Sequence, residues 1–156
     1  MFNDLNSDTT HSWLNSGTKI ALTADLEQDS FSNTKTWKAH DVKKDMGFKA
    51  REYISLGDKQ KIAKRSLSKY FITGNYIVEG DTYTINVELC STQNAKLVSS
   101  NQYQGNDFFS LIDLASHQIK LDMKIPLTYL EGKTDLPIKD RLTDSMDALK
   151  YYTYYK

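Results

Sequence analysis

Two stretches in the middle of the chain alternate apolar and polar residues and are separated by a short turn. Residues 70–79 read YFITGNYIVE and residues 82–90 read TYTINVELC, with Gly80 and Asp81 between them. Counting outwards from this turn gives four facing pairs, which are Val78 with Tyr83, Tyr76 with Ile85, Gly74 with Val87, and Ile72 with Leu89. Seven of these eight side chains are apolar or aromatic, so the pattern predicts an antiparallel hairpin with one buried face.

The opposite face of this hairpin is polar. It would carry Thr73, Asn75, Glu79, Thr82, Thr84, Asn86 and Glu88, with Ile77 as the one apolar exception. A third run, residues 96–103, is polar after Leu97 and Val98, which suits a strand at the edge of a sheet. We therefore expect a sheet that faces water on one side.

Apolar residues three and four positions apart predict helices on both sides of the hairpin. The strongest such pattern covers residues 107–124 and places these residues on one face: Phe108, Leu111, Ile112, Ala115, Ile119 and Met123. Weaker patterns predict helices over residues 8–28, 40–47, 58–69 and 143–156, and a short strand over residues 36–38. Residues 127–142 show no pattern and are expected to be irregular.

Capping residues place the ends of some of these helices. Asp8, Thr9 or Thr10 is expected to cap the first helix, and Thr143 the last one. The first helix carries its stripe through Trp13, Leu14, Gly17, Ile20, Ala21 and Ala24, while Leu22 and Leu26 fall on the far side. Gly17 in its interior costs about 1 kcal/mol relative to Ala and permits close packing.

Together these elements predict an α/β sandwich of two layers. The sheet is mixed, with the hairpin in its antiparallel C-terminal part and the helices mainly on one face. A chain of 156 residues suits one domain with a real core. We assign residues 1–142 to this domain and residues 143–156 to the start of a following helical, repeat-like region.

The composition is that of an ordinary globular chain, and the formal net charge is zero. A net charge of zero does not favour nucleic acid or an anionic membrane as a partner. The basic cluster of residues 59–65 is interpreted as the solvated face of a helix whose Ile62, Ala63 and Leu67 point inward. The lone Cys90 excludes an internal disulfide, and neither a membrane-spanning run nor a signal peptide is recognisable.

No pattern of catalytic residues emerges from the chain. His11, His40 and His117 lie far from one another and from Cys90, which argues against a metal site. Asp113 and His117 are four residues apart, and we interpret them as a solvent-facing pair. Phosphate-binding loops and nucleophile elbows are absent, and Ser66 with Lys69 has Ser-x-x-Lys spacing but lacks its partner motifs. We predict no enzyme and no cofactor.

Four tyrosines crowd the last six residues: Tyr151, Tyr152, Tyr154 and Tyr155. One helix face cannot bury all four, so either some stay exposed or further protein covers them. An exposed aromatic cluster usually marks a contact site. These tyrosines are the predicted interaction surface.

Four segments resemble the TolB amino-terminal-like domain of bacterial signalling proteins. Residues 2–8 (FNDLNSD) resemble its turn after the first strand, with Asp4 and Asn6 departing, and residues 22–26 (LTADL) resemble its first helix. Residues 70–76 with 80–89 resemble its Tyr-x-Leu-x-Gly strand and partner strand, and residues 107–113 (DFFSLID) its Asp-x-Phe-x-Leu-x-Asp helix start. The family's first strand precedes Phe2, so residues 1–5 would be its remnant, or the chain starts inside the domain.

The resemblance implies a role that the residues alone do not. Such domains occur in membrane-anchored winged-helix regulators, adenylate cyclases and Ser/Thr kinases, often ahead of tetratricopeptide repeats. It implies a non-catalytic sensory or protein-interaction module with protein, and not nucleic acid, as its partner. A first strand left out of the chain would expose sheet edges and invite self-association. The implied location is periplasmic or otherwise extracytoplasmic, with the cytoplasm as the alternative. The alternative function is a small-ligand sensor with a pocket between the sheet and helix 107–124.

Overall fold

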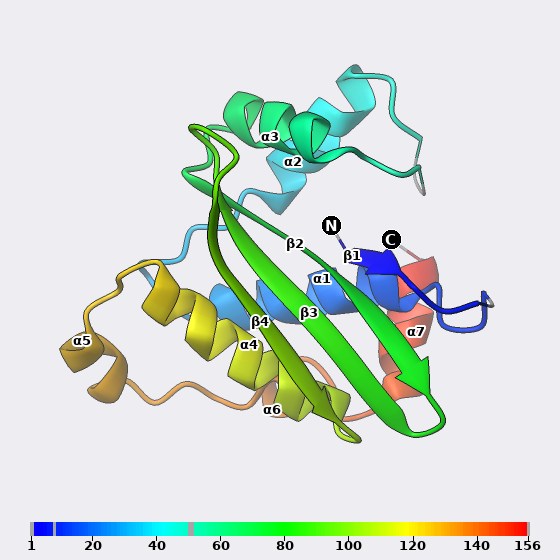
Figure 1. Ribbon diagram of the computed structural model, residues 1–156. Coiled ribbons are helices and arrows are strands. Elements are labelled where there is room, and N and C mark those ends of the chain that lie inside the picture. Colours follow the sequence, from blue (N-terminus) through cyan, green and yellow to red (C-terminus); the bar gives the residue numbers. More distant parts are fainter. Residues whose placement is uncertain (1, 8, 50–51, 156) are drawn as a thin grey trace.

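The computed structural model describes residues 2–7, 9–49 and 52–155 and has a four-stranded sheet as its centre (Figure 1). The strands are β1 (Phe2–Asp4), β2 (Tyr70–Glu79), β3 (Thr82–Ser91) and β4 (Leu97–Gly105), and they lie side by side in that order. β1 runs parallel to β2, whereas the other neighbours are antiparallel, so the sheet is mixed as expected. The four predicted facing pairs of the hairpin are all confirmed.

Helices cover mainly one face of this sheet. In chain order they are α1 (Leu14–Leu26), α2 (Thr36–Asp45), α3 (Leu56–Arg65), α4 (Phe108–Asp122), α5 (Leu127–Glu131), α6 (Ile138–Arg141) and α7 (Met146–Tyr154). α4 packs against β3, β4 and α1, while α6 and α7 lie against α1. Figure 1 shows the sheet in front of α1 and α4, and α2 with α3 as a separate lobe at one end of the sheet. The predicted two-layer α/β sandwich is therefore confirmed.

The main core lies between the sheet and the α1–α4 layer. Its sheet side consists of the predicted inward face, with Tyr76, Ile85, Val87 and Leu89 at most 4% exposed. Five of the six predicted apolar residues of α4 are also buried, and Met123 is half-buried against them. Asp107 caps this helix by accepting from the amides of Phe109 and Ser110. The strongest sequence patterns thus build the largest apolar cluster.

Residues 36–38 do not form the predicted strand, because they begin α2. A strand needs a neighbour with unpaired backbone groups, whereas a helix satisfies its own, as when the amide of Ala39 donates to the carbonyl of Lys35. The helix predicted over residues 40–47 is the second half of α2. The chain turns away from it at Gly47, which has φ of 82°.

The first helix begins later than predicted, at Leu14, and no side chain caps it. Thr9 and Thr10 lie in a turn ahead of it, and Asp8 is outside the described residues. Leu22 and Leu26, which the periodicity placed on the far side, are buried at 3% and 5% exposure. They are buried because α1 is covered from two sides, by the sheet layer with α4 and by α6 with α7.

Three further expectations differ at the ends of elements. Residues 127–142 contain the short helices α5 and α6, each led by a proline, and are not wholly irregular. Ser145, not Thr143, caps α7, and the Thr143 hydroxyl accepts from the amide of Ser145 instead. Leu67 does not point inward but is 77% exposed, because the chain leaves α3 there with φ of 59°.

Candidate functional site

The four predicted tail tyrosines all lie at the surface, on α7 or next to its end. Their exposed fractions are 66% for Tyr151, 44% for Tyr152, 55% for Tyr154 and 86% for Tyr155. Tyr151 and Tyr154 are three residues apart in α7, so they lie next to each other on one side of the helix, and Tyr155 follows at its end. A tyrosine offers a large apolar ring with a hydroxyl that can donate or accept, which suits a contact with another protein.

A single buried leucine fixes α7 to the rest of the molecule. Leu149 is 1% exposed and belongs to the main core. It approaches α1 at Gly17, where an added Cβ would lie 3.0 Å from the Trp13 ring and 3.6 Å from a Leu149 methyl group. The predicted close packing at Gly17 is confirmed, and it holds the tyrosine-bearing helix in place.

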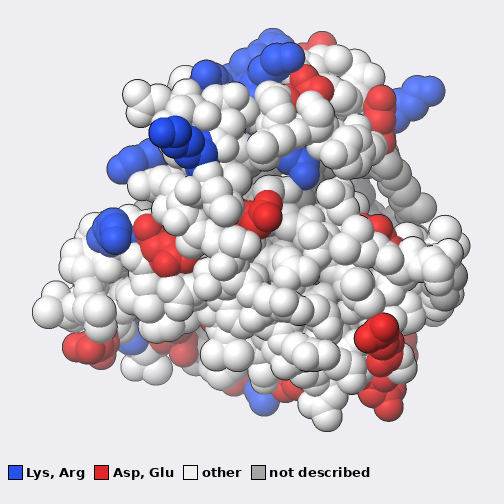
Figure 2. All heavy atoms as spheres, in the orientation of Figure 1, with Lys and Arg blue, Asp and Glu red and all other residues white. Residues whose placement is uncertain are grey.

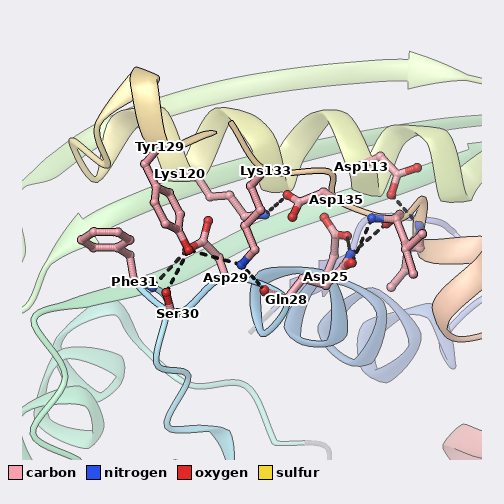
Figure 3. A network of polar contacts seen from close by, with 12 residues as sticks. Asp25, Gln28, Asp29, Ser30, Phe31, Asp113, Lys120, Tyr129, Lys133 and Asp135 are labelled. Carbon is pink, nitrogen blue, oxygen red and sulfur yellow. Dashed lines mark hydrogen bonds and ion pairs between the residues drawn. The ribbon is translucent and has the colours of Figure 1, made fainter. Parts of the chain in front are cut away.

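A network of polar contacts ties residues 126–142 across the ends of α1 and α4 (Figure 3). The buried Lys120 of α4 donates to Asp135 at 2.5 Å, and Lys133 donates to the carbonyl of Gln28 at 2.6 Å. The Gln28 side chain bridges both ways, since it donates to the carbonyl of Leu136 and accepts from the amide of Leu136. These contacts hold residues 126–142 against α1 and α4, and we call this set of contacts the clamp.

Asp113 belongs to this clamp and not to a pair with His117. Its carboxylate accepts from the amide of Ile138 at 2.8 Å and thereby holds the start of α6, while His117 lies exposed. Burial raises the pKa of the Asp113 carboxyl above its usual value. The two side chains do line one hollow of about 200 Å³ together with Asp25 and Asp135. Leu136 and Pro137 complete the lining of this hollow.

The other candidate groups are scattered or buried. The Ser66 hydroxyl is buried and donates to the carbonyl of Ile62, and Lys69 is exposed, so they do not act together. Cys90 is 2% exposed within β3, and burial raises the pKa of its thiol, which disfavours the reactive thiolate. Within residues 2–7, 9–49 and 52–155, no three His, Cys, Asp or Glu side chains gather as metal ligands.

The predicted ligand pocket between the sheet and α4 is filled by core side chains, among them Ile85 and Ile112 at 1% exposure each. A hollow of about 350 Å³ lies elsewhere, between the end of α3 and the β3–β4 turn. Lys64, Lys69 and Tyr70 line it, together with hydroxyl and amide side chains. It is open to solvent, unlike a typical small-molecule site.

The sheet itself ends in an uncovered strand, as the sequence predicted for residues 96–103. β4 pairs with β3 on one side, and its nine residues carry neither charge nor proline. On the open face one row of carboxamides crosses all four strands: Asn3, Asn75, Asn86 and Gln102. The self-association predicted from a missing first strand stays a prediction.

Sequence reasoning missed the clamp. Lys120 is buried on the core side of α4, and its partner Asp135 comes from a segment with no periodic pattern. Nothing in the spacing of the two residues indicates that they meet. Across the described part of the chain, no helix has the length and apolar character needed to cross a membrane.

No protein-family model matches this chain, and no curated protein matches it either. A solved structure with a similar fold is the C-terminal domain of LpoB from Salmonella enterica. The likeness covers 66% of this chain and 74% of that one, with a TM-score of 0.50 and 12% identity. At this identity the likeness concerns the fold alone, so the chain shares an architecture with that domain.

Proposed function

We propose that this chain is a protein-interaction module without a catalytic role, carried by a larger bacterial signalling protein. The observation that carries the proposal is the tail tyrosine surface, which consists of Tyr151, Tyr152, Tyr154 and Tyr155. These rings are exposed although α7 is firmly anchored through Leu149. An exposed aromatic cluster on a fixed helix is the kind of anchor that protein interfaces use.

Two further observations support the proposal. The carboxylates that could serve as acids or bases, Asp113 and Asp135, are engaged in the clamp. The fold is similar to that of the C-terminal domain of LpoB, and four segments resemble the TolB amino-terminal-like domain. Fold analogy is a weak warrant for function, and the surface chemistry therefore carries the argument.

A site-specific photo-crosslinker tests the interaction directly. It is placed at Tyr154, which is 55% exposed, and in a matched variant at Leu114 on α4, which is 57% exposed. We expect a discrete crosslinked protein from Tyr154 in the native host and none from Leu114. The partner identified by mass spectrometry should then bind the purified chain and lose affinity for the Tyr151→Ala/Tyr155→Ala variant. Identical products at both positions, or none, would overturn the proposal.

We further propose that the module works outside the cytoplasm, as the TolB-like resemblance implies. Cys90 of this chain is buried, and the unmodified full-length protein in the same cells sets the background for thiol labelling. A Leu114→Cys variant of the full-length protein should react with a membrane-impermeant maleimide in intact cells. Labelling only after lysis would place the module in the cytoplasm instead.

A further inference from the structure

The zero net charge of this chain conceals a sharp separation of charge. Residues 35–69 contain eleven lysines and arginines against four aspartates and glutamates, a formal charge of +7. The rest of the chain contains nine against sixteen, a formal charge of −7. The net charge of the whole chain cancels this difference, although the order of the residues preserves it.

The structure gathers the positive half into one place. The described residues of this stretch, 35–49 and 52–69, form the lobe of α2 and α3 at one end of the sheet, and we call this the basic lobe (Figure 1). In Figure 2 most of the blue atoms lie over this lobe, while red atoms predominate over the lower part of the molecule. The charge is therefore separated in space as well as in sequence.

Most cations of the basic lobe face outward because apolar side chains occupy its inward positions. Val42, Ile54 and Ile62 form its small apolar cluster. Lys44, Lys49 and Lys64 are among its exposed side chains. Where cations do lie close to the body, as Lys59 does against Thr73 at 2.6 Å, burial lowers the pKa of the amine. The outer cations are the ones available to a partner.

Aromatic rings are exposed on the same lobe. Trp37 at the start of α2 is 68% exposed, and Tyr53 ahead of α3 is 74% exposed. Trp and Tyr beside lysines are typical of surfaces that sit at a lipid–water interface, where the ring enters the headgroup region and the ammonium groups meet lipid phosphates.

We propose that the basic lobe binds the surface of an anionic lipid bilayer, with Trp37 and Tyr53 at headgroup depth. The acidic remainder of the molecule is repelled by the same surface, so the lobe is turned towards the bilayer and the body away from it. This proposal concerns peripheral binding and is independent of the tail tyrosine surface.

Nucleic acid is the competing anion, and two observations disfavour it. Nine of the eleven cations are lysines, whereas the planar, bidentate guanidinium of Arg is the residue of choice for nucleic-acid recognition. Two of the sheet aromatics that could stack on bases are turned into the core, since Tyr76 is 2% exposed and Tyr83 packs edge-on against Phe108. Lysines act as point charges, which suits the mobile phosphates of lipid headgroups.

Co-sedimentation with vesicles tests the proposal. Vesicles of phosphatidylcholine with 30% phosphatidylglycerol are compared with phosphatidylcholine alone, at low and at high salt. We expect binding to the anionic vesicles only, weakened at least tenfold by salt because exposed charges are screened. The emission of Trp37 should shift to the blue on binding, against the constant background of the buried Trp13, and this shift should vanish in Trp37→Phe.

Two triple variants with the same change in net charge distinguish binding by the basic lobe from an effect of the total charge of the molecule. Lys44→Glu/Lys49→Glu/Lys64→Glu reverses exposed cations of the basic lobe, and Lys124→Glu/Lys139→Glu/Arg141→Glu reverses exposed cations of the acidic part. Both should melt close to the wild type, since all six side chains are exposed. We expect the first to lose at least tenfold in vesicle binding and the second to stay within about twofold.

Three results would overturn the proposal. They are absence of binding to anionic vesicles at low salt, equal loss in the two triple variants, and tighter binding to a single-stranded oligonucleotide or to polyglutamate than to the vesicles. The last would assign the basic lobe to nucleic acid or to an acidic protein.

Discussion

Among the residues that the structure describes, the main body of the molecule buries eighteen side chains in one apolar cluster, whereas the basic lobe buries three in a cluster of its own. The main body comprises the sheet with α1, α4, α6 and α7, and the basic lobe comprises α2 and α3. The free energy of folding grows with the apolar area removed from water. The main body therefore gains more folding free energy from apolar burial. The basic lobe exposes mostly charged side chains, and we expect its fold to depend on contacts with the main body.

The largest expected effect compares one isoleucine in each region. Ile112→Ala in the main core, where the side chain is 1% exposed, should lower the free energy of unfolding by about 4 kcal/mol. Ile62→Ala in the lobe, at 7% exposure, should cost about 2 kcal/mol. Urea unfolding measures both. For Ile62→Ala, amide hydrogen exchange should become faster only in α2 and α3. Faster exchange in β3 as well would show that the stability of the main body depends on the lobe.

The next comparison uses one glycine in each region. An added Cβ at Gly74 would lie 2.0 Å from the Asn86 carbonyl oxygen of β3 and 2.8 Å from the Phe2 ring of β1, so Gly74→Ala forces β2 away from both neighbouring strands and should cost about 3 kcal/mol. At Gly57 in α3 the nearest atom would be 3.9 Å away. Gly57→Ala should therefore stabilise by about 0.5 kcal/mol through the unfolded chain. A destabilised Gly57→Ala would show the lobe to be tighter than its contacts indicate.

A buried ion pair in the body has an exposed counterpart in the lobe. Asp135→Ala leaves the Lys120 ammonium, 1% exposed, without its carboxylate and should cost about 3 kcal/mol. The double variant Lys120→Met/Asp135→Ala should recover most of that loss because no charge is left buried. Lys61→Ala removes the exposed pair with Asp58 and should leave the urea midpoint unchanged. Failure of the double variant to recover would assign the loss to other clamp contacts.

Each region also has a helix that begins at a capping side chain. Asp107→Ala on α4 and Ser55→Ala on α3 should each cost about 1 kcal/mol at pH 7. Hydrogen bonds from Ser110 lower the pKa of the Asp107 carboxyl, so its contribution is present above the ordinary carboxyl pKa and is lost as the pH falls through the lowered one. Wild type and Asp107→Ala should converge in acid. A constant difference down to pH 2 would contradict this.

The smallest effect has the opposite sign and belongs to Asp113. Burial raises the pKa of this carboxyl, so the folded state binds its proton more readily than the unfolded state does. Relative to Asp113→Asn, the wild type should gain stability as the pH falls through the raised pKa towards the ordinary value near 4. Thermal melting at pH 4, 5, 6 and 7 measures the difference. A wild type that loses stability relative to the variant over this range would show that the Ile138 hydrogen bond outweighs burial.

The periodic pattern of apolar residues predicted the structure correctly where an element packs against the core through one face. The hairpin register and the apolar stripe of α4 followed from counting, because each element presents a single face to the core. Counting failed for Leu22 and Leu26, since α1 is covered from two sides. It also failed at residues 36–38, where three residues cannot show whether a strand partner exists.

The candidate surfaces divide in the same way. The exposed tail tyrosines were foreseeable, because four rings in six residues exceed what one helix face can bury. The clamp was not, because Lys120 and Asp135 meet only through the return of residues 126–142. The order of charged residues along the sequence indicates the basic lobe, whereas the net charge of the whole chain does not.

By itself the order of residues determined the hairpin, its register, the main amphipathic helix and the separation of positive from negative charge. These depend on neighbours within a few positions or on simple counting. Tertiary structure alone decided which face of α1 is buried, which lysine is desolvated and where the cations gather in space. Those properties depend on segments brought together by the fold, and local patterns carry no information about such distances.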